Sequence, residues 1–148
     1  MTALAANRKR RVRNVEAMQR VGTILQADSI TLYEGSIGSH NGAGKIAVGA
    51  DTSGHRAAGV SATNSVSGAS NTTVYPALEF GHEEWFVNNG GVTAAMMGKD
   101  VCILDDQTVA PSATTTNDVP LGQAIELQTI DSVAGVWVRV ASFTGSLA

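Results

Sequence analysis

The chain has 148 residues, 43% of them hydrophobic and 16% charged, which suits one folded domain and excludes a disordered chain. Only 5% of the residues are aromatic and 16 are glycine, a composition typical of short strands and turns rather than of long helices. Cys102 is the sole cysteine, which excludes an internal disulfide, and no apolar run approaches the ~18 residues of a membrane span.

The first 20 residues hold six bases against one acid, a net charge of +5, whereas the remainder carries a net charge of -8. The bases are Arg8, Lys9, Arg10, Arg11, Arg13 and Arg20. We interpret residues 1–11 as a flexible arm, and we expect no secretory signal because the charges follow the short apolar start. Apolar side chains at every third position from Val12 to Val21 predict a short amphipathic helix over roughly residues 12–20. A basic arm on an acidic body indicates binding to a polyanion or to an acidic protein surface.

The rest of the chain has the pattern of short strands separated by turns. Strands are expected at residues 29–34, 46–48, 57–60, 74–80, 83–88, 100–104, 122–130 and 136–140. Turn-rich or polar loops are expected at residues 35–45, 61–73 and 110–118. In the last strand Val136, Val138 and Val140 point to one face, and Trp137 and Arg139 point to the other.

This spacing predicts an all-β fold, a small antiparallel sandwich or barrel-like β domain. The domain would span residues 23–148, with the basic arm and its possible short helix at residues 1–22. Edge strands in such a fold invite pairing with other chains.

Residues 38–45 resemble a phosphate-binding loop only in part. Ser39 stands where that motif needs its first glycine, and Ile46 stands where it needs a hydroxyl to ligate magnesium. We therefore interpret this segment as a plain turn.

The three histidines, His40, His55 and His82, are far apart in sequence, and we interpret them as unrelated surface or turn residues rather than metal ligands. Glu83 and Glu84 are neighbours on an expected strand, so their side chains should point to opposite faces and not share a site.

Asp105 and Asp106 occupy an expected turn. Cys102 lies between apolar neighbours, which favours a buried structural thiol over a nucleophile. Asn71 begins a glycosylation sequon, which we attribute to chance. No catalytic, cofactor-binding or metal-binding residue is assigned, and an enzyme is the least favoured class.

Several segments together resemble the bacteriophage capsid decoration, or cement, proteins. The segments are residues 56–60 (RAAGV), residues 91–101 leading into 103–109 (ILDDQTV), residues 119–126 (VPLGQAIE) and residues 135–140 (GVWVRV). The resemblance covers roughly residues 29–141, and its specificity lies in the order and spacing of the segments. The basic N-terminal extension is not part of the pattern.

The resemblance implies a structural virion protein that binds the outer surface of an icosahedral phage head and cements neighbouring major capsid subunits. It implies major capsid protein and further copies of the chain as partners, in a trimer or dimer, without a cofactor or a membrane. The implied location is the outer capsid surface, with the host cytoplasm during assembly.

For the basic residues from Arg8 to Arg20 we expect docking on an acidic groove of the coat protein. The alternatives are a minor capsid or head–tail joining protein, or a nucleic-acid-binding module that uses the arm. Nucleic acid is the less favoured partner, because no aromatic residue interleaves with the bases to stack on nucleobases.

Overall fold

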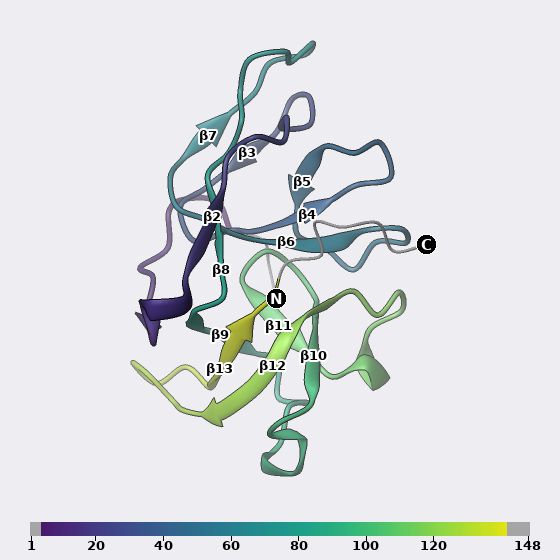
Figure 1. Ribbon diagram of the computed structural model, residues 1–148. Coiled ribbons are helices and arrows are strands. Elements are labelled where there is room, and N and C mark those ends of the chain that lie inside the picture. The colour runs from purple at the N-terminus through teal and green to yellow at the C-terminus, as the bar shows by residue number, and fades with distance from the viewer. Residues whose placement is uncertain (1–3, 142–148) are drawn as a thin grey trace.

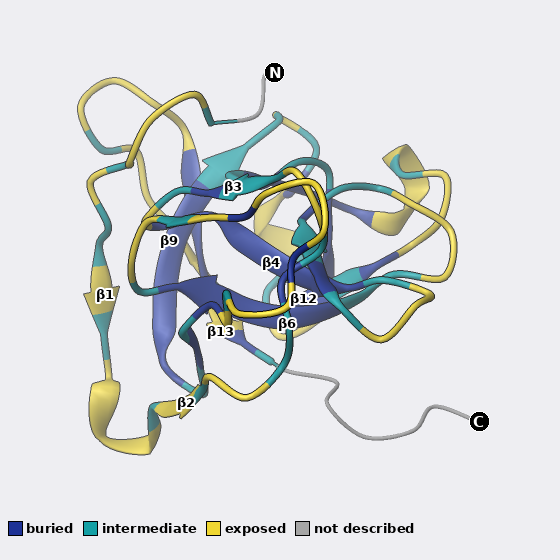
Figure 2. Ribbon diagram, turned by 90° about the horizontal axis from the view of Figure 1, so that it is seen from above, coloured by how far each residue is buried: buried dark blue, intermediate teal, exposed yellow. Residues whose placement is uncertain are grey.

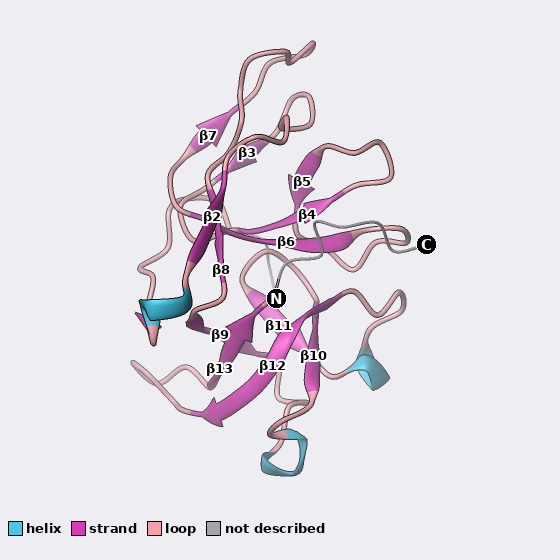
Figure 3. Ribbon diagram, in the orientation of Figure 1, coloured by secondary structure: helices cyan, strands magenta, loops and turns pink. Residues whose placement is uncertain are grey.

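Strands and turns make up the computed structural model, which describes residues 4–141 (Figure 1). Its helical elements are three short 3-10 turns, η1 (Val15–Ala17), η2 (Ala94–Met96) and η3 (Ser112–Thr114), as Figure 3 shows. The predicted all-β class is therefore confirmed. Residues 1–3 of the expected arm and residues 142–148 of the expected domain lie outside the described residues.

The C-terminal half forms a closed barrel of five strands. They are β9 (Glu83–Asn88), β10 (Asp100–Ile103), β11 (Thr108–Ala110), β12 (Pro120–Leu127) and β13 (Gly135–Val140). The ring runs β9-β11-β10-β12-β13 and closes through an antiparallel pairing of β13 with β9. The contact of β11 with β9 is parallel. A sixth strand, β1 (Val12–Arg13), pairs with the beginning of β9 on its outer edge.

A second sheet of five strands lies beside the barrel (Figure 1). Its order is β2 (Gln19–Val21), β8 (Leu78–Phe80), β6 (Arg56–Ser61), β4 (Ile37–His40) and β5 (Ile46–Val48). A two-stranded ribbon of β3 (Thr31–Leu32) and β7 (Ser65–Val66) extends away from the barrel (Figure 1).

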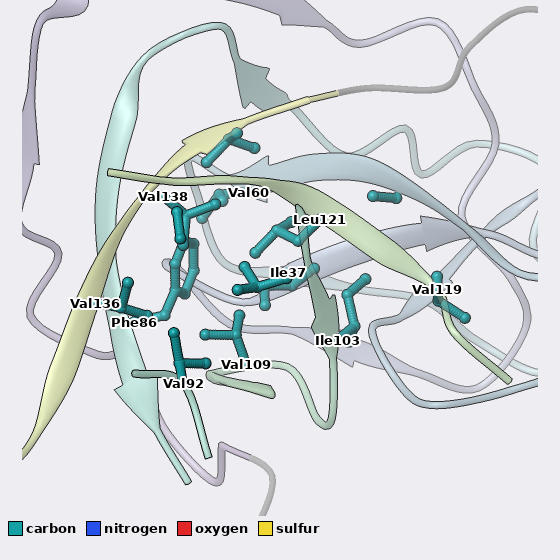
Figure 4. Packing of buried hydrophobic residues seen from close by; sticks show 14 residues of the cluster. Ile37, Val60, Phe86, Val92, Ile103, Val109, Val119, Leu121, Val136 and Val138 are labelled. Atoms are coloured by element: carbon teal, nitrogen blue, oxygen red, sulfur yellow. The ribbon is translucent and has the colours of Figure 1, made fainter. Parts of the chain in front are cut away.

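One apolar core joins the barrel to the second sheet (Figure 4). Phe86, Leu121 and Val138 of the barrel pack in it with Ile37 and Val60 of the second sheet. A smaller cluster fills the other face of that sheet, where β3 contributes a buried leucine. Since both faces of the sheet are covered, β4 is buried along its whole length and β6 is buried from residue 57 onward.

Most expected strands are present. The bounds of β5 and β9 are those expected; β10 and β13 differ from expectation by one residue at one end, and β6 by one residue at each end. Only the end of the expected strand 74–80 and the middle of 29–34 are extended and paired. As expected, the three valines of β13 are buried in the core, while Trp137 and Arg139 lie on the other face.

The expected helix at residues 12–20 is wrong. Asn14 has a left-handed backbone (φ 51°), which interrupts a right-handed helix, and the segment forms β1, η1 and β2 instead. Such a short helix is marginal alone, whereas the extended segment gains hydrogen bonds from β9 and β8. Val12 and Val15 remain exposed, so their spacing does not reflect burial.

The expected flexible arm and two expected loops also need correction. Residues 4–11 lie on the body, with hydrogen bonds described below. Residues 35–45 contain the buried strand β4, and residues 61–73 contain β7. Gly38 allows this burial, because a Cβ there would meet the Leu78 side chain at 3.0 Å.

Candidate functional site

The N-terminal segment runs along the outside of both sheets (Figure 2). We call residues 4–21 the N-terminal strap. The backbone N–H of Leu4 donates to a carboxylate oxygen of Asp106 at 2.8 Å, and that of Arg8 donates to the Glu34 carbonyl at 3.1 Å. The Arg11 carbonyl accepts from Trp85 at 3.0 Å. Together with β1 on β9 and β2 on β8, these bonds tie the strap to the barrel and to the second sheet.

Three buried glutamates receive the basic side chains of the strap. We call Glu79 of β8 and Glu83 and Glu84 of β9 the glutamate cluster. Strand alternation places Glu84 on the side of β9 that carries the core residue Phe86, and Glu83 on the other side. The two neighbours have different partners, as expected from their opposite orientations.

Glu84 is the centre of a buried ionic network. Its side chain has 0% exposure and forms ion pairs with Arg8 and, at 2.6 Å, with Arg10. The side chains of Arg8 and Arg10 are 11% and 13% exposed. His82 lies 2.7 Å away through Nε2. Arg8 also donates to the carbonyls of Gly35 and Trp85 at 2.7 and 3.0 Å. A buried charge held by this many partners strongly constrains the strap.

Glu79 links this network to the end of the strap. One of its oxygens accepts from Arg10 at 2.7 Å, and the other accepts from Arg20 at 2.6 Å. Arg10 therefore bridges Glu79 and Glu84, and one charged network spans β8 of the second sheet and β9 of the barrel.

The outer face of the barrel holds a second, more exposed set of contacts. Arg13 lies between Glu83 at 2.8 Å and Glu126 at 2.7 Å, and its guanidinium stacks 4.1 Å from the ring centroid of Trp137. Arg139 adds a further bond to Glu83 at 3.1 Å. Arg11 extends the row to Asp131 in the β12–β13 hairpin at 2.6 Å.

The network shifts the pKa values of its carboxyl groups downward. Burial by itself raises the pKa of Glu84, but the hydrogen bonds of His82 and Arg10 and the charge of Arg8 outweigh it, so the pKa lies below its ordinary value. Burial likewise opposes a lowered pKa at Glu79 and Glu83, and hydrogen bonds to arginines of the strap help to lower both. All three groups are therefore held as carboxylates, with the strap as counter-charge.

Two glycines allow the strap to approach closely. Gly35 has φ +88°, and a Cβ there would meet the Arg8 side chain at 2.5 Å. Gly81, in the turn between β8 and β9, has φ +90°, and a Cβ there would meet the Ala17 carbonyl at 2.5 Å. Both positions need glycine for its backbone conformation and for the missing side chain.

The six basic residues predicted as a partner-binding site thus have different surroundings. Arg8, Arg10, Arg11, Arg13 and Arg20 each form an ion pair within the chain, and Lys9 is exposed. Charge reasoning identified the basic residues but missed the glutamate cluster as their receptor. The available signal was the negative charge of the remaining chain, which indicated an acidic surface without locating it.

The other polar candidates have structural surroundings. Ser39 and His40 belong to β4 rather than to a turn, and the Ser39 hydroxyl lies 3.0 Å from Nδ1 of His55. His82 is buried against Glu84. Among the described residues no group of three or more His, Cys, Asp or Glu side chains could hold a metal ion.

Three further residues have clear structural roles. Cys102 is buried, as expected, and burial raises the pKa of its thiol. Asp106 is also buried and accepts from Ser36 at 3.0 Å as well as from the strap. The Asn71 side-chain amide donates to the carbonyls of Gln26 and Val74, so the folded protein does not present its sequon as a free acceptor.

Comparison of the chain with protein-family models, with curated proteins and with solved structures gives no match. Within residues 4–141, no helix has the length and apolar character needed to cross a membrane.

Proposed function

We propose that this protein is a structural, non-enzymatic virion protein that binds the outer surface of an icosahedral phage head and cements neighbouring major capsid subunits. The observation that carries the proposal is where the segments of the family resemblance fall. Residues 100–109 correspond to the β10–β11 hairpin, and residues 119–126 and 135–140 correspond closely to β12 and β13. The resemblance thus includes four of the five barrel strands and, through residues 56–60, strand β6 of the second sheet, while residues 91–99 form a loop with η2.

The β body supplies the capsid contacts in this proposal. A closed barrel has few free strand edges, so it presents side chains and loops rather than unpaired backbone to a partner. Val66 and Tyr75, which are among the most exposed large apolar side chains described, are candidates for contact with coat protein. Many copies, each with a modest contact of this kind, stabilise a shell collectively.

The role expected for the basic residues changes in this proposal. Five of the six already neutralise carboxylates of their own chain, so they are not available as a free cationic arm for a coat-protein groove. The same pairing weighs against the alternative of a nucleic-acid-binding module, which needs cations free to contact phosphates. Within residues 4–141, Lys9 is the exposed base of the strap without an ion pair, whereas Arg20 is exposed but paired with Glu79.

Cosedimentation with expanded phage heads that lack the protein tests the proposal. We expect saturable binding at a fixed copy number per coat subunit. Absence of binding would refute the decoration role, and a stable ring or tube formed without heads would favour the head–tail joining alternative.

Matched charge variants then test the remaining contribution of the strap. Lys9→Glu should weaken head binding if Lys9 contacts coat protein, whereas Lys99→Glu reverses a lysine that is also exposed but lies outside the strap, and it should bind as the wild type does. Equal binding by both variants would leave the β body alone as the contact surface.

A further inference from the structure

The apolar cores contain no residue of the strap. In chain order, Leu32 is the first buried member of the two clusters, and Ile24 is the first partly buried side chain that packs against them. Before Gln26 no described residue is fully buried. The strap is therefore attached by ion pairs, by hydrogen bonds and by the cation–π contacts of Arg8 with Phe86 and of Arg13 with Trp137, and it contributes no side chain to either apolar cluster.

Nearly all contacts of the strap reach distant parts of the chain. Arg8 bonds to Gly35, Arg20 to Glu79, and Arg11 to a residue 120 positions away. Between residues of the strap, the backbone hydrogen bond described is the one in η1, from the N–H of Met18 to the carbonyl of Val15. The contacts of the strap are thus mainly with the rest of the chain, which we call the body, and hardly with other residues of the strap. The body of a second, identical chain offers the strap the same partners.

An exposed connector links the strap to the body. Gly22 and Thr23 are exposed, and a Cβ at Gly22 would meet no atom within 4 Å. The backbone can therefore change direction here without displacing packed side chains. An extended strap spans on the order of 60 Å, at about 3.3 Å per residue, which is enough to reach a neighbouring molecule.

Opening of the strap removes the arginine partners of Glu79 and Glu84. Glu84 is fully buried, and Arg8 and Arg10 are its cationic partners. A buried charge that loses its partner is strongly unfavourable, so an opened molecule gains by capturing another strap. The body without its strap is acidic and the strap is basic, so a second strap is the complementary ligand.

We propose that the N-terminal strap is exchangeable, so that the strap of one copy binds the glutamate cluster of a second copy through the contacts it makes within its own chain. Exchange of an identical element is a low-cost route to oligomers, since the closed and exchanged forms contain the same bonds. The fraction of molecules in the exchanged form rises with protein concentration. This inference does not depend on the proposed capsid role.

Cysteine crosslinking across β2 and β8 tests the exchange. Gln19 and Phe80 are directly opposite Cα partners, and opposite residues of antiparallel strands lie about 4.5–5.5 Å apart, within disulfide range. Full-length Gln19→Cys and Phe80→Cys, one carrying a size tag, are mixed at high concentration or refolded together and then oxidised. We expect a disulfide-linked heterodimer whose yield rises with concentration.

Two controls make the result decisive. The double variant Gln19→Cys/Phe80→Cys should crosslink within one chain at low concentration, which shows that the substituted protein folds and the strands pair. The mixture of Gln123→Cys and Arg139→Cys has the same cross-strand relation inside the barrel, where no exchange is expected. A heterodimer yield severalfold above this mixture supports the proposal. A yield no higher than this mixture, alongside efficient crosslinking in the double variant, overturns it.

Discussion

Replacing Glu84 by Gln should destabilise the protein more than replacing any exposed carboxylate. The substitution keeps the side-chain shape but removes the charge that Arg8 and Arg10 share. Breaking a buried pair by removing one partner costs about 3–5 kcal/mol, because the other charge stays buried. Domains of this size have about 5–15 kcal/mol of total stability, so the loss is a large fraction of the whole.

Urea and thermal unfolding measure this loss. With about 2–4 °C per kcal/mol for a chain of this length, the melting temperature should fall by roughly 10 °C. Glu126→Gln is the matched control, because Glu126 also pairs with a strap arginine but its side chain is 53% exposed. An exposed pair is worth at most about 1 kcal/mol. Equal losses in the two variants would refute the assignment of Glu84 as the buried anchor of the strap.

Three further outcomes are expected. The glutamate cluster has pKa values below the ordinary 4.5, so its stabilisation is present above pH 4.5 and is lost as the pH falls through the lowered values; Asp106, whose pKa burial raises, acts in the opposite direction. The urea concentration at the unfolding midpoint should therefore decrease once the pH is lowered below 4.5. A midpoint at pH 3 equal to that at neutral pH would contradict this. Gly81→Ala should cost about 1–3 kcal/mol by strain and by collision with η1, whereas Gly42→Ala, which meets open space, should unfold as the wild type does. Arg13→Ala should cost about 1 kcal/mol, because it removes the pair with exposed Glu126 and the cation–π contact while buried Glu83 keeps Arg139 as a partner. It should also red-shift the fluorescence of the uncovered Trp137, and an unchanged emission would argue against the stacking.

Local patterns in the sequence determined much of the strand content. Alternation of apolar and polar residues predicted β13, because a strand with one face in the core repeats every two residues. The same reasoning failed for β4, whose Gly38, Ser39 and His40 are typical of a turn. That strand is buried on both faces by the sheets around it, a condition no local pattern encodes.

The charge asymmetry of the chain was likewise visible in the sequence, and it indicated binding of the basic segment to a polyanion or to an acidic protein surface. Only the tertiary structure decided that this surface belongs to the same chain. Glu79 and Glu84 come together with Arg8 and Arg10, and Glu83 with Arg13, through contacts between residues 69 to 76 positions apart. Closure of the barrel by β13 on β9 has the same origin, because strand pairing depends on long-range packing rather than on local preference.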